Sequence, residues 1–225
     1  MLARLVDAIG VANDDFVVEI GPGEGALTRP LLERAAKLHV IELDRDLAAR
    51  LAAEFPEKLV VHQADALELD FALFPPGMRL VGNLPYNIST PLLFHLGKFA
   101  ARVRDMHFML QLEVVERMVA APSTAAYGRL SVSLQARFRM KKLFKVSKGA
   151  FRPPPKVESA VVRLEPLAQS LEIDEDLLRK AFSARRKTLK NALPGVDFNA
   201  LGIDPKLRPE NLSPQDYARI SAAVR

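Results

Sequence analysis

The sequence contains no cysteine and no tryptophan among its 225 residues. The absence of cysteine excludes a thiolate zinc site, a disulfide framework and a cysteine nucleophile. No apolar run approaches the roughly 18 residues of a membrane span. The chain start lacks the basic stretch and the small-residue cleavage site of a signal peptide. We therefore expect a cytoplasmic protein that binds no membrane and no metal.

The positive charge is concentrated in the C-terminal part of the chain. Residues 1–136 contain 13 Lys and Arg against 17 Asp and Glu, a net charge of −4. Residues 137–225 contain 19 against 10, a net charge of +9, and the two parts sum to +5. Such segregation favours a polyanionic partner. The alternative is a solvated basic surface without a partner.

Short β-rich runs alternate with helical patterns in the first half, as in a parallel sheet with crossover helices. Strands are expected at residues 16–20, 38–43, 59–63, 78–82, 106–112, 142–146 and 160–164. Helices are expected at residues 26–36, 46–55, 90–99, 113–121 and 127–138, and the chain also opens with helical spacing. The sequence predicts an α/β, Rossmann-like fold with an open, mostly parallel sheet.

A second, helical part follows. Helical patterns cover residues 174–186, 187–193 and 213–224, with Ser213 as an expected cap before Pro214. At roughly 100–200 residues per domain, the length fits one full domain and a small one. We place the first domain at residues 1–167 and a helical C-terminal domain at 168–225. The proline-rich stretch 151–156 is expected to be a stiff, exposed loop, because proline lacks an N–H and restrains its predecessor.

The strongest local signal is the glycine-rich segment GPGEG, which begins at Gly21 between a strand and a helix. Gly21 and Gly23 let the backbone turn tightly and approach a ligand, although many ordinary strand-to-helix turns contain such glycines. Glu42 ends the second strand, where a carboxylate accepts hydrogen bonds from ribose hydroxyls. Asp65 ends the third strand. These two acids can alternatively cap helices. Acids without nearby cations disfavour a pyrophosphate, whereas a cationic or zwitterionic nucleoside such as S-adenosylmethionine fits.

The fourth strand ends in the segment GNLPYNIS, from Gly82 to Ser89. The Asn83 side chain and the Leu84 carbonyl can accept N–H bonds from a planar amine, and Tyr86 can stack on its ring. Pro85 restrains the segment. A packed turn without a ligand is the alternative. The four histidines have no ligand spacing, so the sequence predicts no metal site.

Several segments together resemble the small-subunit ribosomal RNA adenine N6-dimethyltransferases, the KsgA family. They include GPGEGALT, IELDRDLAARL, QADAL, GNLPYNISTPLLFHL, YGRLSV and FRPPPKVESAVVRL, and the resemblance runs from about residue 16 to the C-terminus. It implies an S-adenosylmethionine-dependent methyltransferase that dimethylates two adjacent adenines in the 3'-terminal hairpin of small-subunit rRNA. S-adenosylhomocysteine would be the product. The family also acts in late subunit assembly, which implies an immature 30S-type particle as partner; we expect a monomer.

The resemblance also implies roles for particular residues. Gly21 and Gly23 would approach the methionine part of the cofactor, Glu42 the ribose and Asp65 the adenine amino group. The residues expected at the target amine are Asn83, Leu84, Pro85, Tyr86 and Phe151, with Asn83 also near the cofactor. Phe151 would form the second face of an aromatic sandwich around a flipped adenine. The basic residues expected to grip rRNA phosphates, or else to form a solvated surface, are Lys142, Lys148, Arg152, Arg185, Arg186 and Lys187.

One family feature has no match. Members carry a Gln-Asn-Phe-Leu segment upstream of the first helix, whose Asn and Leu contact the cofactor. Its absence suggests a shortened chain and weaker cofactor binding. An alternative function is therefore an RNA-binding assembly factor with little or no methyltransferase activity. A methyltransferase for large-subunit rRNA is a third possibility, but the helical tail and FRPPPKVESAVVRL match the small-subunit group better.

Overall fold

The computed structural model describes residues 1–150 and 156–224, which fall into two compact units. The first unit contains Met1–Val115 and Met140–Pro166, and the second contains Glu116–Arg139 and Leu167–Arg225. The second unit is therefore discontinuous in sequence. Its boundary at residues 166 and 167 lies beside the predicted one, but the prediction did not place residues 116–139 in this unit.

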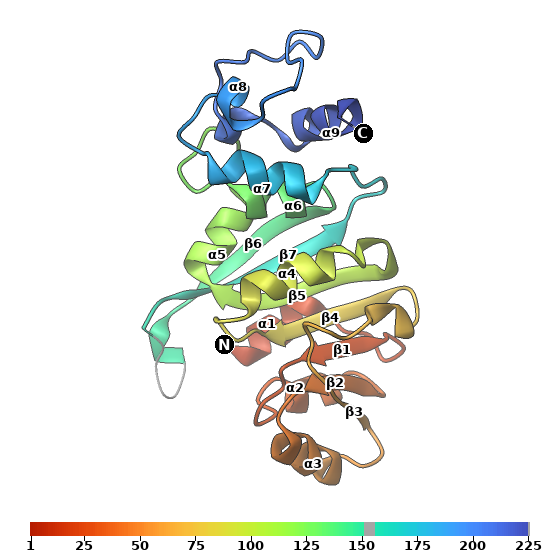
Figure 1. Ribbon diagram of the computed structural model, residues 1–225. Helices are drawn as coiled ribbons and strands as arrows, with labels where there is room; N and C mark the ends of the chain where they lie inside the picture. The colour runs from red at the N-terminus through yellow and green to blue at the C-terminus, as the bar shows by residue number, and fades with distance from the viewer. Residues whose placement is uncertain (151–155, 225) are drawn as a thin grey trace. The chain divides into compact units, whose positions relative to one another are not determined.

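A seven-stranded sheet forms the centre of the first unit, in the order β3-β2-β1-β4-β5-β7-β6 (Figure 1). Its strands are β1 (Val17–Ile20), β2 (Leu38–Glu42), β3 (Leu59–Gln63), β4 (Met78–Asn83), β5 (Val103–Gln111), β6 (Phe138–Val146) and β7 (Ser159–Pro166). The five strands from β3 to β5 pair in parallel, and β7 pairs antiparallel to β5. The predicted α/β, mostly parallel sheet is confirmed.

The strand order reverses between β1 and β4. Strands β2 and β3 lie on one side of β1, whereas β4 and β5 lie on the other. Such a switch point opens a crevice at the carboxyl ends of the two central strands, and ligands of open α/β sheets bind there. The segments that follow β1 and β4 begin at Gly21 and Leu84, so the fold brings the two strongest sequence signals to this crevice.

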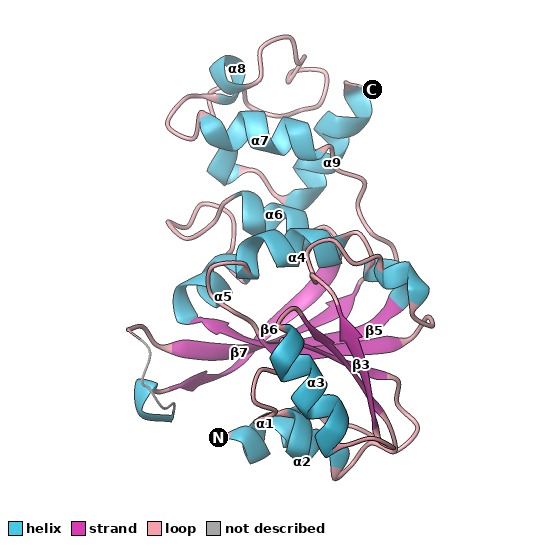
Figure 2. Cartoon of the chain, turned by 60° about the horizontal axis from the view of Figure 1, so that its bottom comes forward, coloured by secondary structure: helices cyan, strands magenta, loops and turns pink. Residues whose placement is uncertain are grey.

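Helices cover both faces of the sheet. Figure 2 shows α1 (Leu2–Ile9), α2 (Thr28–Leu32) and α3 (Arg45–Glu54) on one face and α4 (Ser89–Gly97) on the other. The face under α1 to α3 packs a cluster of buried aliphatic side chains that includes Leu5, Leu31 and Leu51. α2 is shorter than the predicted helix at residues 26–36, since it ends at Leu32 with Glu33 as its C-cap.

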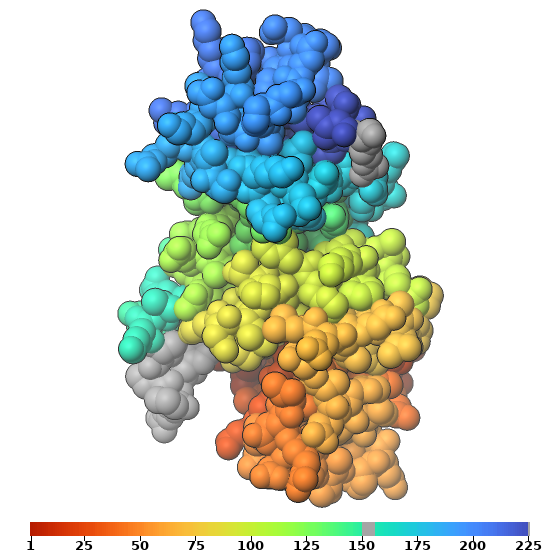
Figure 3. Space-filling model, in the orientation of Figure 1, coloured from red at the N-terminus to blue at the C-terminus, as the bar shows by residue number. Residues whose placement is uncertain are grey.

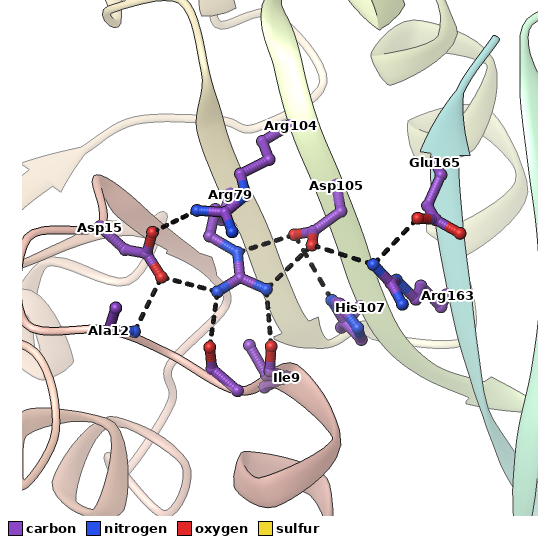
Figure 4. Close-up of polar contacts among 10 residues, drawn as sticks. Ile9, Ala12, Asp15, Arg79, Arg104, Asp105, His107, Arg163 and Glu165 are labelled. Atoms are coloured by element: carbon purple, nitrogen blue, oxygen red, sulfur yellow. Dashed lines mark hydrogen bonds and ion pairs between the residues drawn. The ribbon is translucent and has the colours of Figure 1, made fainter.

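A buried arginine fastens α1 to the sheet at the amino end of β4 (Figure 4). Arg79 is 4% exposed and donates to the carbonyl oxygens of Ile9 and Gly10, which end α1. It also bonds Asp105 with two parallel hydrogen bonds of 2.9 Å and Asp15 at 2.7 Å. Burial alone would raise the pKa of Asp105, but Arg79 and the His107 ring hold that pKa well below its usual range. The network is structural and lies at the sheet edge opposite the crevice.

The second unit is helical and has its own core. It contains α6 (Arg129–Gln135), α7 (Glu175–Ser183), α8 (Leu189–Ala192) and α9 (Pro214–Ala223), and α5 (Leu112–Met118) spans the boundary. Tyr127 and Tyr217 are fully buried, and their hydroxyls donate to backbone carbonyls at 2.9 and 2.8 Å. Ser213 caps α9 by accepting a hydrogen bond from the Asp216 N–H, which confirms the predicted cap.

The predicted helix at 127–138 runs too far. The helix α6 ends at Gln135, and Phe138 already belongs to β6. The carbonyl oxygens of Ala136 and Arg137 accept hydrogen bonds from Leu171 and Leu167, so the chain exits toward the later segment. This contact between residues distant in sequence terminates the helix.

Candidate functional site

A pocket of about 400 Å³ opens at the switch point. Its walls come from the carboxyl ends of four parallel strands, and they consist of Ile20, Gly21, Ile41, Glu42, Leu43, Asp44, Ala64, Asp65, Ala66, Pro85, Asn87 and Ile88. The predicted residues Gly21, Glu42, Asp65 and Pro85 therefore lie in one pocket. Four other predicted residues are close in sequence to lining residues but do not line the pocket themselves: Gly23, Asn83, Leu84 and Tyr86.

The glycine turn shapes the first wall. Gly21 and Gly23 have φ angles of 67° and 56°, in the left-handed region that other residues rarely adopt. The Gly21 N–H donates to the Ile41 carbonyl at 3.0 Å, which joins the end of β1 to β2. The turn therefore brings bare backbone to the pocket.

Glu42 holds this turn from the end of β2. Its side chain is buried, and its two carboxylate oxygens accept hydrogen bonds from the Gly23 and Asp44 N–H groups at 3.1 and 2.9 Å. Each carboxylate oxygen has two lone pairs, so one acceptor site per oxygen remains for a ligand hydroxyl. Glu42 thus connects the glycine turn to α3 and still has capacity for a ligand.

Asp65 occupies the corresponding place after β3. Its Oδ1 accepts a hydrogen bond from the Leu67 N–H at 2.8 Å, so it does stabilise the following turn. It also lines the pocket, and it is only partly buried. The capping role and a ligand role therefore do not exclude each other.

A further acid, Glu19, lies beneath the glycine turn. It is 1% exposed, and the Thr28 hydroxyl donates to its Oε2 at 2.7 Å. Its partner in the β1–β2 register is Val40, two residues before Glu42, so both acids point to the same face of the sheet. Burial, together with the nearby charge of Glu42, raises the pKa of Glu19 to about 7.

The Asn83–Tyr86 segment leaves β4 at the same edge. The Leu84 N–H donates to the Met109 carbonyl at 3.2 Å, and the Leu84 side chain is buried. The hydroxyls of Tyr86 and Ser159 share a hydrogen bond of 2.8 Å, which ties the segment to the start of β7. Asn83 and Pro85 are exposed. The segment is thus anchored by its apolar residue and its tyrosine hydroxyl, with the amide side chain at the surface.

Asp44, Asn87 and Ile88 are among the pocket residues that sequence reasoning did not assign. Asp44 also caps α3, since its Oδ1 accepts the N–H groups of Asp46 and Leu47. The sequence signal that could have identified them is their position one or two residues after Glu42 or Tyr86. Phe151, predicted as the second aromatic face, lies outside the described residues.

The predicted RNA-contacting residues have different environments. Lys148, Arg186 and Lys187 are exposed and Lys142 is half-buried, whereas Arg152 lies outside the described residues. Arg185 bonds the Glu210 carboxylate and donates to the Ala125 carbonyl at 2.8 Å, so it stabilises the second unit. Figure 3 shows one face of this unit, formed largely by residues after 166.

Within residues 1–150 and 156–224, no cluster of three metal-ligating side chains occurs. No helix in the described part of the chain is long and apolar enough to cross a membrane. A glycine turn and acids at successive strand ends around a switch-point pocket are the features of a ligand-binding crevice in a doubly wound α/β protein.

Comparisons with known proteins identify the family. The model of the family described as ribosomal RNA adenine dimethylase matches residues 1–225. A "Ribosomal RNA small subunit methyltransferase A" from Thiobacillus denitrificans is 58% identical, over 97% of this chain and 90% of its own. Its counterpart from Aromatoleum aromaticum is 57% identical, over 98% and 88%.

Solved structures agree. A dimethyladenosine transferase from Plasmodium falciparum is 27% identical with a TM-score of 0.84, and the match covers 97% of this chain and 93% of that one. The 23S rRNA methyltransferase ErmE is 25% identical with a TM-score of 0.73, over 99% and 96%. The chain belongs to the ribosomal RNA adenine dimethylase family. It is an rRNA-modifying methyltransferase with a Rossmann-like sheet.

Proposed function

We propose that the protein transfers methyl groups from S-adenosylmethionine to the N6 amines of two adjacent adenines in the 3'-terminal hairpin of small-subunit rRNA. S-adenosylhomocysteine is the second product. The observation that carries this proposal is the switch-point pocket beside the Asn83–Tyr86 segment, in a chain of this family. The names of the 57–58% identical relatives support the small subunit as the source of the rRNA.

The pocket residues fit the proposed cofactor. Gly21 and Gly23 present backbone without a Cβ, so the methionine part can approach closely. The remaining lone pairs of Glu42 accept the ribose hydroxyls, and Asp65 accepts the adenine amino group. Acids at this edge also favour a cationic ligand. The bound sulfonium supplies a methyl group with a good leaving group, so positioning accounts for much of the rate.

The Asn83–Tyr86 segment receives the acceptor base. The adenine N6 lone pair is delocalised into the ring, so this amine is a poor nucleophile until its N–H groups are held. The Asn83 Oδ1 and the Leu84 carbonyl oxygen accept those N–H bonds, and the Tyr86 ring stacks on the base. The hydrogen bond between Tyr86 and Ser159 fixes the ring beforehand. Phe151 is proposed as the opposite face on the resemblance alone.

Exposed basic residues then hold the RNA backbone. Lys148, Arg186 and Lys187 are the candidates with free access to solvent, and Lys142 is a half-buried one. Neutralising phosphates in this way makes RNA binding salt-dependent. We propose that the protein acts as a monomer on an immature 30S-type particle late in its assembly, in the cytoplasm where such particles form. The alternative of an inactive assembly factor gains no support, since the relatives are named as methyltransferases.

Calorimetric titration with S-adenosylhomocysteine tests the proposed cofactor site. Glu42→Gln and Asp65→Asn each remove a charged acceptor, and hydrogen bonds to charged groups contribute about 1.5–3 kcal/mol. We expect Kd to rise about 10- to 100-fold in each variant. Glu57→Gln changes an exposed acid in the turn between α3 and β3, so it is the matched control and should leave Kd unchanged. Equal Kd values in all four proteins would place the cofactor elsewhere.

A further inference from the structure

A second, smaller pocket lies between α1 and the end of β6. It has a volume of about 280 Å³ and is lined by Met1, Arg4, Phe144, Lys145, Val146 and Ser147. All of these residues belong to the first unit. Ligand pockets commonly measure roughly 300–1,000 Å³, so this one is too small for a whole cofactor. Its size suits a single nucleotide unit.

The pocket is positively charged. Arg4 and Lys145 are exposed, and no acid is among the lining residues. Neither cation forms an ion pair with a residue of the described ranges. Asp7, one turn after Arg4, is instead bonded to Arg34. The two positive charges are therefore available to an anionic ligand.

The Arg4 guanidinium is held in place by an aromatic ring. Its central carbon lies 4.0 Å from the centroid of the Phe144 ring, and the ring packs against the buried cluster that includes Leu5 and Val146. A cation–π contact of this kind contributes about 0.5–1 kcal/mol at an exposed site and orients the planar group. RNA bases stack on such guanidinium planes. The pocket thus offers a preformed stacking surface beside a lysine.

This pocket lies at the active edge of the sheet. The register places the start of β7 beside Gln111 at the carboxyl end of β5, and the described part of the β6–β7 connection leaves the sheet there. Figures 1 and 2 both show the chain start on that side of the first unit. The switch-point pocket opens at the carboxyl ends of the same sheet. A nucleic-acid strand bound at one site can therefore continue toward the other.

We infer that the Arg4–Lys145 pocket binds one nucleotide of the rRNA substrate outside the target base, with the base stacked on Arg4 and its phosphate paired with Lys145. The inference rests on the proposed function for its ligand class. It adds an anchoring site that positions the RNA strand and takes no part in methyl transfer. The Phe144 ring contributes by orienting the Arg4 guanidinium and does not itself contact the nucleotide.

The test compares two double variants in binding a fluorescent RNA hairpin that carries the target adenines. Arg4→Gln with Lys145→Gln removes the pocket's charges. Lys37→Gln with Lys58→Gln removes two exposed charges from the amino edge of the sheet and serves as the matched control. Lys145→Gln alone leaves the packing of Phe144 untouched, so it remains interpretable if the double variant is unstable. Kd is measured over a series of salt concentrations, and kcat and KM for methyl transfer are measured separately.

We expect the pocket variant to raise Kd about 10-fold or more, to lower the slope of log K against log salt by about 0.7–0.9 for the one phosphate lost, and to raise KM without changing kcat. The control should change Kd less than 3-fold. Equal effects of both double variants would overturn the inference in favour of a diffuse basic surface. Unchanged hairpin binding by the pocket variant would also overturn it, since no nucleotide of that RNA would then depend on the pocket. Failure of the wild-type protein to transfer methyl groups would instead refute the proposed function.

Discussion

The buried acid Glu19 gives the sharpest prediction about stability. Its side chain is 1% exposed, and burial and the Glu42 charge raise its pKa to about 7, from an ordinary value of 4.5. The folded state therefore favours the protonated form. This contribution to stability is present at pH values below 4.5, declines as pH rises toward 7, and is lost above that value. The folded protein at pH 8 contains a poorly solvated carboxylate.

Replacing Glu19 by glutamine removes that charge and keeps an oxygen to accept the Thr28 hydroxyl. The difference of 7 − 4.5 = 2.5 pKa units corresponds to about 3 kcal/mol at about 1.36 kcal/mol per unit. We expect Glu19→Gln to be more stable than the wild type by about 2–3 kcal/mol at pH 8. The difference should be below about 1 kcal/mol at pH 4.5.

Urea unfolding at pH 4.5, 6 and 8 measures this difference. Unfolding is followed by circular dichroism, because the chain has no tryptophan for fluorescence detection. Glu33→Gln, an exposed acid at the end of α2, is the control and should show no such pH dependence. A Glu19→Gln protein that is equally stable or less stable than the wild type at pH 8 would refute the reasoning. The carboxylate would then be solvated or paired in the native state.

Two further substitutions test the fold around the site. Arg79→Met removes both charged hydrogen bonds that Arg79 donates to the buried Asp105 carboxylate, so we expect a loss of about 3–5 kcal/mol at pH 7. The loss should shrink below pH 4 as the aspartate protonates, and urea unfolding at both pH values measures it. Gly82→Ala places a Cβ 2.6 Å from the Ile20 carbonyl oxygen between β1 and β4, so we expect about 1–3 kcal/mol of destabilisation and weaker cofactor binding. In Gly149→Ala the Cβ meets no atom within 4 Å, and an equal loss there would contradict this explanation.

Local sequence patterns were sufficient for most of the sheet. The expected strand at 59–63 matches β3, and those at 16–20 and 38–43 differ from β1 and β2 by one residue. These strands are short runs rich in β-branched residues between turns, so the pattern has little room to shift. The helix at 127–138 was too long because contacts from residues 167–171 end it, and those contacts are invisible locally. The inclusion of residues 116–139 in the helical unit has the same origin.

The candidate site was predictable for those residues whose position depends only on the order of the strands. Gly21, Glu42 and Asp65 each lie at the carboxyl end of a parallel strand. Parallel strands end at one edge of the sheet, so the meeting of these residues in one pocket follows from the order of elements. Arg185 was harder to interpret. Its partner Glu210 is 25 residues away, and only the folded chain shows that this arginine is used inside the second unit.

The most direct test of the central claim is the transfer of labelled methyl groups from S-adenosylmethionine to small ribosomal subunits that lack adenine dimethylation. Modified positions are mapped on the extracted rRNA, for the wild type and for Asn83→Ala. The account predicts dimethylation of two adjacent adenines in the 3'-terminal hairpin by the wild type, and at least a 10-fold lower rate with the variant. Methylation at other positions, or an Asn83→Ala protein as active as the wild type, would contradict it.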